Sequence, residues 1–170
     1  TASYQAHDLS GITLSAYDLP GVNLASQNLT NTHFYVNLTA ANFSQANLTN
    51  ANLSGGTLTG ATFTGAEVRG ANLGNTTQSG FTAAKLYSTA SYKAHDLRGV
   101  RFGASDLTGW NFSGQNLKDA RFGVALPWGA KGSRWVPARL KDADFSDAVI
   151  HGADFTETTE QGFTKEQLYS

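Results

Sequence analysis

Few residues of this chain have the chemistry of catalysis, and their spacing keeps them apart. The sequence has four histidines and no cysteine. His7 and His95 occupy equivalent positions, each followed by Asp, and we expect them to pack near the start of each half of the chain. His33 and His151 each lie one residue from an expected core position, so they should face outward, far from one another. The four histidines therefore do not form a catalytic or metal-binding set.

The carboxylates give no motif for metal binding or hydrolysis. Four of them follow one another late in the chain, at Asp142, Asp144, Asp147 and Asp154. Their spacing is not that of a calcium-binding loop, whose ligands alternate and end in a glutamate. The 18 glycines lie mostly in turns, and no glycine-rich phosphate-binding motif is present. We therefore expect a protein that is not an enzyme, with no catalytic residue, no metal and no cofactor.

One segment combines aromatic rings with positive charge. Residues 127–139 hold Trp128 and Trp135, two of the three tryptophans, and no acid follows before Asp142. The cations of this stretch are Lys131, Arg134, Arg139 and Lys141. Tryptophan attracts cations and stacks on flat ligands, and arginine pairs with anions, so this loop is a candidate site for an anionic ligand, a glycan or a protein partner. The alternative is that both tryptophans cover core that a break in the repeat would expose.

These side chains must be positioned by a five-residue repeat, A-(D/N)-L-x-x, that runs through most of the chain. Between Ala41 and Leu73 the repeat is almost unbroken: ANFSQ ANLTN ANLSG GTLTG ATFTG AEVRG ANL. We call the Leu or Phe of each repeat its centre. The residue two positions before the centre is usually small, and most often Ala. Because residues two apart share a face of extended chain, the centre and the small residue should both point inward.

A period of five fits neither an α-helix nor a straight strand. It fits a chain that bends once per repeat, so that four bends close a square coil of about 20 residues, stacked about 4.8 Å from the next coil. The chain resembles the pentapeptide-repeat family over nearly its whole length. The resemblance implies an all-β fold, a right-handed quadrilateral β-helix solenoid. Its inward Leu, Phe and Ala would form the core, while Asn, Asp, Ser, Thr and Gly supply turns and outward polar groups.

The sequence also repeats on a longer scale. TASYQAHDLSG opens the chain and TASYKAHDLRG begins at Thr89, while QSGFTAAKLYS ends at Ser88 and EQGFTKEQLYS ends at Ser170. We therefore predict two modules, 1–88 and 89–170, stacked as one continuous solenoid with a non-repeat insertion at 127–139.

Each module should close on a short helical interruption of the solenoid. Thr82 and Thr164 would begin these turns as N-caps, and Gln167 would complete a capping box in the second. Leu86 and Leu168 should seat the two turns on the adjacent coil.

The two ends of the chain carry the sequences that meet inside it at Ser88 and Thr89. Copies joined end to end would continue the pattern, and no polar cap is visible over either terminal coil. We therefore expect a longer array or end-to-end stacking. The candidate contacts at such a junction are Tyr4, Leu168 and Tyr169.

The charge balance favours neither nucleic acid nor membrane as a partner. The 170 residues include 12 basic and 13 acidic side chains, for a net charge of -1, and no run of 18 apolar residues occurs. We expect a protein partner or further copies of the chain, with no nucleic acid and no membrane insertion. The compartment stays open, with a lean towards export or the cell surface because the chain starts with Thr and lacks Cys.

Some members of the family that the chain resembles protect DNA gyrase by mimicking duplex DNA, and such a mimic needs a strongly acidic rod. Residues 1–88 hold only three acids, and residues 89–170 balance ten acids with ten bases. The leading interpretation is therefore a non-catalytic structural or scaffold protein that mediates protein–protein contact or end-to-end self-assembly. The alternatives are a gyrase-interacting DNA mimic, and binding of a glycan or anionic ligand through the Trp/Arg loop.

Overall fold

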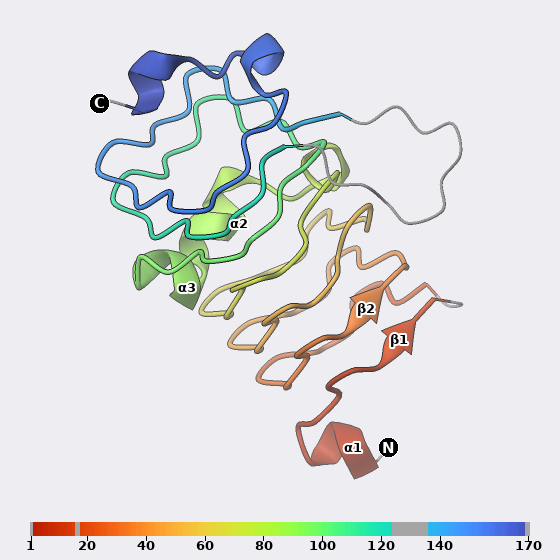
Figure 1. Ribbon diagram of the computed structural model, residues 1–170. Helices are drawn as coiled ribbons and strands as arrows, with labels where there is room; N and C mark the ends of the chain where they lie inside the picture. Colours follow the sequence, from red (N-terminus) through yellow and green to blue (C-terminus); the bar gives the residue numbers. More distant parts are fainter. Residues whose placement is uncertain (1, 16–17, 124–135, 169–170) are drawn as a thin grey trace.

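The computed structural model describes residues 2–15, 18–123 and 136–168, and Figure 1 shows a solenoid with the two chain ends at its opposite ends. Its named elements are short. They are α1 (Ala2–Gln5), β1 (Thr13–Leu14), β2 (His33–Phe34), the 3-10 turn η1 (Thr77–Ser79), α2 (Ala83–Ser88), α3 (Ala90–Lys93), and the 3-10 turns η2 (Thr159–Gln161) and η3 (Lys165–Leu168).

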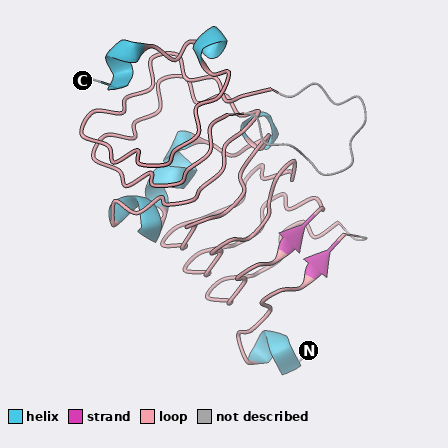
Figure 2. Ribbon diagram, in the orientation of Figure 1, coloured by secondary structure: helices cyan, strands magenta, loops and turns pink. Residues whose placement is uncertain are grey.

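Parallel pairing between successive coils builds the solenoid. β1 pairs with β2 in the register Thr13↔His33, and isolated bridges with offsets of 19 or 20 residues, such as Asn28↔Asn47 and Asn42↔Thr62, continue the pairing along the first half. Each side of a coil is too short to form more than a bridge, which is why Figure 2 shows mostly loop. The four-sided coil of about 20 residues that the repeat predicts is confirmed.

The centres form a continuous apolar core. Leu29, Leu48, Phe63 and Phe112 are buried, as are small residues such as Ala46. Phenylalanines stack from coil to coil along one side, with ring centroids 5.1 Å apart for Phe43 and Phe63 and 5.2 Å apart for Phe112 and Phe145. The inward assignment of centres and small residues is therefore correct for the inner coils.

The corner after each centre is a tight turn closed by a backbone hydrogen bond. The N–H of Ala41 donates to the carbonyl oxygen of Leu38 at 3.0 Å, and Ala40 between them has φ 57°. Among the described residues the same left-handed position recurs in most repeats, held by Gly, Asn, Asp or another residue, but not in the shorter corner after Phe34. The position before it has a negative φ, so the corners have the pattern of type II turns. Pro20 before Gly21 fits this pattern, because proline favours the first central position.

The Asn or Asp before each centre holds the next corner. Its side-chain oxygen accepts a hydrogen bond from the backbone N–H two residues on. Asn47 Oδ1, for example, accepts the Thr49 N–H at 3.0 Å. The Thr49 hydroxyl donates to the same oxygen at 2.6 Å. This local bond explains why the repeat favours Asn or Asp there, and Ser or Thr after the centre.

Nine extra residues enter the solenoid where η1, α2 and α3 lie. The pairing Asn72↔Arg101 spans 29 positions, whereas Asn52↔Asn72 spans 20. Leu86 on α2 is completely buried, as the sequence predicts. Thr82 lies at the N-cap of α2 in extended conformation, but its side chain makes no capping bond, so this part of the expectation is wrong.

The second interruption differs from the expected insertion at 127–139. The N–H of Ala138 donates to the Phe122 carbonyl at 2.7 Å, the same bond that closes an ordinary corner. Arg139 already pairs with Asp106 in the ladder. Ala138 and Arg139 therefore belong to the repeat, and the extra residues enter within one corner after Phe122 instead of replacing a coil.

Candidate functional site

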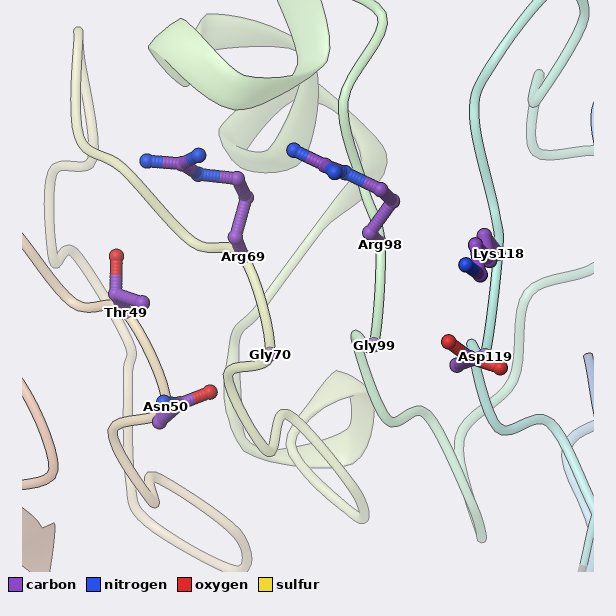
Figure 3. A pocket seen from close by; sticks show the side chains of 8 residues that line it. All are labelled: Thr49, Asn50, Arg69, Gly70, Arg98, Gly99, Lys118 and Asp119. Atoms are coloured by element: carbon purple, nitrogen blue, oxygen red, sulfur yellow. The ribbon is translucent and has the colours of Figure 1, made fainter.

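A shallow hollow of about 410 Å³ lies at one corner of the middle coils. Figure 3 shows Arg69, Arg98 and Lys118 on three successive coils, beside Asn50 and Asp119. Each of the three cations follows a centre, so the 20-residue and 29-residue offsets place them in one column. The sequence alone does not reveal this column, because its members come from separate repeats and only the register aligns them.

Carboxylates neutralise most of the charge in this hollow. Arg98 binds Asp96 through both ends of its guanidinium, with Nε to Oδ1 at 2.7 Å and Nη2 to Oδ2 at 2.8 Å. Hydrogen bonding and charge from Arg98 lower the pKa of Asp96 below its usual value. Arg69 lies between Glu67 and Asp96, 3.7 Å from each. A hollow with paired charges of both signs has little preference for an anion or a cation.

Most of the Trp/Arg loop lies outside the described residues. These are Trp128, Lys131, Arg134 and Trp135. The structure places Arg139 and Lys141 on the two sides of the centre Leu140, and Arg139 Nη1 lies 3.6 Å from Asp106 Oδ2. This exposed ion pair leaves Arg139 engaged with the solenoid. Whether the loop is a binding site stays a prediction.

The histidines do not face the core. His7 and His95 have φ values of 58° and 55° and are exposed, so both are left-handed residues that follow the short helices α1 and α3, instead of inward small-residue positions. Within the described ranges, no three His, Asp or Glu side chains gather closely enough to hold a metal ion. None of the described helices is long and apolar enough to cross a membrane.

Residues 1–88 and residues 89–170 are closely packed where they meet, at the internal junction. The rings of Tyr87 on α2 and Tyr92 on α3 lie 4.5 Å apart. The Ser91 hydroxyl donates to Glu67 Oε2 at 2.9 Å and accepts the Val68 N–H at 2.8 Å. The Thr89 side chain caps α3 by accepting the Tyr92 N–H.

Residues at the start of the chain make the same contacts as the residues that follow this junction. Tyr4 on α1 donates its hydroxyl to the Asn23 carbonyl at 2.8 Å, as Tyr92 does to the Asn111 carbonyl at 3.0 Å. Gln27 Nε2 donates to the Tyr4 carbonyl at 3.1 Å, and Gln115 makes the matching bond to Tyr92 at 3.1 Å. The two segments therefore fold alike at these positions, 88 residues apart.

The two ends of the solenoid differ from the junction in exposure. Leu168 on η3 is 41% exposed, whereas its counterpart Leu86 is completely buried. Leu168 therefore does not seat its turn on an adjacent coil, contrary to the sequence expectation. The centres of the first coil, Leu9, Leu14 and Leu19, are half-buried, while the matching centres Leu97, Phe102 and Leu107 are completely buried. Tyr4 is 39% exposed, and Tyr169 lies outside the described residues.

The repeat is matched by the model of a known family. Residues 37–77, 96–123 and 131–159 match the model of pentapeptide repeats, in eight copies. The chain belongs to the pentapeptide-repeat family. Its fold is therefore the right-handed quadrilateral β-helix that the resemblance implied. Pentapeptide-repeat proteins are generally non-catalytic structural proteins.

Several solved pentapeptide-repeat structures are similar to the chain. HetL from Nostoc sp. strain PCC 7120, involved in the regulation of heterocyst differentiation, is 17% identical over 90% of this chain and 92% of its own, with a TM-score of 0.37. Rfr23 from Cyanothece 51142 is 14% identical over 92% of both chains, with a TM-score of 0.41. QnrB1, a plasmid-mediated fluoroquinolone resistance protein, is 17% identical over 96% of this chain and 85% of its own, with a TM-score of 0.29. A search of curated protein sequences finds no match.

Proposed function

We propose that this pentapeptide-repeat protein is a non-catalytic scaffold that associates with further copies of itself through the two ends of the solenoid. The observation that carries the proposal is the exposure of apolar residues at both ends. Leu168 and the first-coil centres Leu9, Leu14 and Leu19 are partly exposed, although their counterparts at the internal junction are fully covered. Covering such surfaces removes apolar area from water, which favours association by about 25 cal/mol per Å².

The lateral surface of the solenoid supports the same proposal, because its described residues form no well-defined binding site. Its outward side chains are mostly Asn, Ser and Thr in the first half, and many of the Asn side chains accept a backbone N–H of their own turn. The hollow at Arg69 and Arg98 has paired charges. Neither a gyrase-like DNA mimic nor the Trp/Arg loop gains a specific observation from the described residues.

The test is light scattering of the 170-residue chain over a concentration series, beside the variant Leu168→Asp. We expect the mass of the parent to rise with concentration and that of the variant to stay at the monomer. Val136→Asp is the matched control, because Val136 is 47% exposed at a corner of the layer before the last, where its carbonyl accepts the Ala104 N–H, and the charge change is the same. A parent that remains monomeric at every concentration would overturn the proposal.

A further inference from the structure

Both ends of the solenoid present unused backbone hydrogen-bonding groups over a partly exposed core. On the last coil, the described residues supply no acceptor for the N–H groups of Gly152, Phe155 and Glu157. On the first coil, they supply no donor for the carbonyl oxygens of Ser10, Thr13 and Ser15. An unpaired strand edge of this kind pairs readily with another chain.

The internal junction shows how the same groups are used when a coil follows. The Gly70 N–H donates to Arg98 O at 2.8 Å, and the Leu73 N–H donates to Arg101 O at 2.8 Å. The next pair in the series joins the Asn75 N–H to Gly103 O at 3.0 Å. Gly70, Leu73 and Asn75 correspond to Gly152, Phe155 and Glu157, since GANL at 70–73 matches GADF at 152–155.

The acceptors correspond in the same way. Arg98, Arg101 and Gly103 stand 88 positions after Ser10, Thr13 and Ser15, in the sequences SYKAHDLRG and SYQAHDLSG with their continuations. The two coils also have the same backbone course at this side, because β1 pairs Thr13 with His33 as Arg101 pairs with Arg121. The free donors and free acceptors therefore have the spacing of a pair that the protein already makes.

Resting on the self-association proposed above, we infer that a second copy of this chain stacks with its first coil on the last coil of the first copy, in the register of the internal junction. Asp154 of one copy then pairs in parallel with Thr13 of the next, as Asn72 pairs with Arg101. The Phe155 N–H donates to Thr13 O, and the Thr13 N–H donates to Ala153 O, as the Arg101 N–H does to Ala71 O at 3.0 Å. The result is one uninterrupted solenoid, in which the N-terminal end of each copy contacts the C-terminal end of the copy before it.

Side chains at the two ends fit the same register. Ser3 stands where Ser91 accepts the Val68 N–H, and the N–H of the matching Ile150 has no acceptor among the described residues. Thr159 stands where Thr77 accepts the Asp106 N–H at 2.9 Å, facing Asp18 in the next copy. His151 replaces Arg69, whose guanidinium lies 3.7 Å from Asp96, and in the stack it would lie near Asp8. No like charges meet at these positions.

The same register brings the exposed core residues together. Ile150 and Phe155 are half-buried at the last coil, whereas Val68 and Leu73 are completely buried beneath the coil that follows them. A first coil placed on the last one would cover Ile150 and Phe155 with Leu9 and Leu14, as Leu97 and Phe102 cover Val68 and Leu73.

The register can be tested by disulfide cross-linking, because the chain has no cysteine of its own. In the double variant Thr13→Cys/Asp154→Cys, paired positions of adjacent parallel strands come within disulfide reach. We expect oxidation to give a ladder of covalent multimers on a non-reducing gel. An equal mixture of the two single variants should give a covalent dimer of one of each and nothing longer.

The control is Thr13→Cys/Asp144→Cys. Asp144 makes the same turn contact as Asp154, but it pairs with Asn111 on a different side of the coil. We expect no ladder from this pair. Equal ladders from both pairs, or a dimer from either single variant alone, would overturn the register. If the parent's mass grows with concentration but the first pair does not cross-link, the self-association stands and this inference fails.

Hydrogen exchange on the parent chain provides a test that needs no substitution. Dilute and concentrated samples are compared peptide by peptide. We expect concentration to slow exchange in the peptide covering residues 150–157 and to leave peptides from the inner coils unchanged. Growth in mass without slower exchange at 150–157 would show that copies meet through another surface, and would overturn the inference even if the cysteine variants fold poorly.

Discussion

At the scale of the residue, the side chain before each centre is the part of the repeat that sets the corner. Its oxygen accepts the backbone N–H two positions on. The accepting residue is Asn in most of the first half and Asp in several repeats of the second. Both residue types satisfy the turn, but an ionised Asp accepts the more strongly. The corners held by Asp106 and Asp144 are therefore coupled to pH, because the same hydrogen bonds lower the pKa of both carboxyls.

Asp144→Asn tests this coupling. Hydrogen bonds from the Ser146 backbone and hydroxyl lower the pKa of Asp144. A carboxylate whose pKa is lowered by folding contributes stability above its unfolded pKa of about 3.9, and loses that contribution as pH falls through the folded value. We expect the parent's melting temperature to fall further between pH 7 and pH 3 than that of the variant. Identical acid dependence in thermal melts of the two would contradict this account.

Phe112→Asp and Phe63→Asp test the inward assignment of the centres. Both rings are buried, within 1% of full coverage. We expect a loss greater than the about 3–5 kcal/mol that removal of a buried ring costs, because an unpaired charge is also buried. Tyr35→Asp is the control, since Tyr35 is 55% exposed and should change stability little. Normal urea unfolding of either Phe variant would show that the centres do not point inward.

The sequence predicted the inward positions better than the corners. In extended chain, a large and a small apolar residue two positions apart must point to the same face, and their burial shows that this face is the core. His7 and His95 were misplaced because the short helices α1 and α3 replace a regular repeat just before them, and each helix is followed by a left-handed residue.

At the scale of the element, α2 and η3 each have a polar side chain that donates to backbone carbonyl oxygens of the solenoid. Lys85 Nζ donates to Leu58 O at 2.7 Å and also to Gly80 O. Gln167 Nε2 does the same work in the second half, donating to Leu140 O at 3.0 Å and to Ala143 O at 2.6 Å. Gln167 Oε1 also accepts the Thr164 N–H at 2.7 Å, the bond of the capping box that the sequence predicted.

We expect Lys85→Met to destabilise the protein by about 1–3 kcal/mol, because Gly80 O and Leu58 O both lose the Lys85 donor, while Leu58 O keeps the Ala61 N–H. Lys85→Gln should lose less, since Gln serves in the equivalent place. Chemical denaturation of the two variants beside the parent measures the difference. Equal losses from Met and Gln would mean that the charge or length of Lys85, and not its donors, is what matters.

The insertion after Phe122 can be removed if it is only a long corner. An ordinary corner has two residues between the centre and the small residue, as Thr39 and Ala40 have before Ala41. We expect replacement of residues 123–137 by Ser-Gly to preserve cooperative melting and to add on the order of 1–2 kcal/mol, because a shorter loop costs less entropy to close. Replacing Thr39–Ala40 by Ser-Gly is the matched control. A large drop in melting temperature would support the alternative that the insertion covers core.

The boundary of this insertion was misjudged for a definable reason. HFYVNL at 33–38 is similar to RFGVAL at 121–126, and from this likeness alone the repeat would continue to Leu126. Counting back five residues from the centre Phe145 instead gives Leu140 as a centre and Ala138 as its small residue. The hydrogen bond from the Ala138 N–H to the Phe122 carbonyl agrees with this assignment. Sequence likeness cannot say which of two candidate segments closes a corner, because both satisfy the local pattern.

At the scale of the whole molecule, the solenoid is a stack in which each coil is stabilised by its neighbours. One side runs through seven layers, whose centres are Leu9, Leu29, Leu48, Val68, Leu97, Leu117 and Ile150. The inner layers are covered on both sides and the outer two on one. The sequence predicted this architecture and its repeated end segments, while the register of the free donors and acceptors needed the three-dimensional arrangement.

Electron microscopy of the concentrated 170-residue chain tests the end-to-end account most directly. Seven layers about 4.8 Å apart predict filaments with an axial repeat of about 34 Å for each copy added. Straight or gently twisted filaments with that repeat, absent for Leu168→Asp, are the expected result. Monomers at every concentration, or closed dimers of fixed mass, would contradict it.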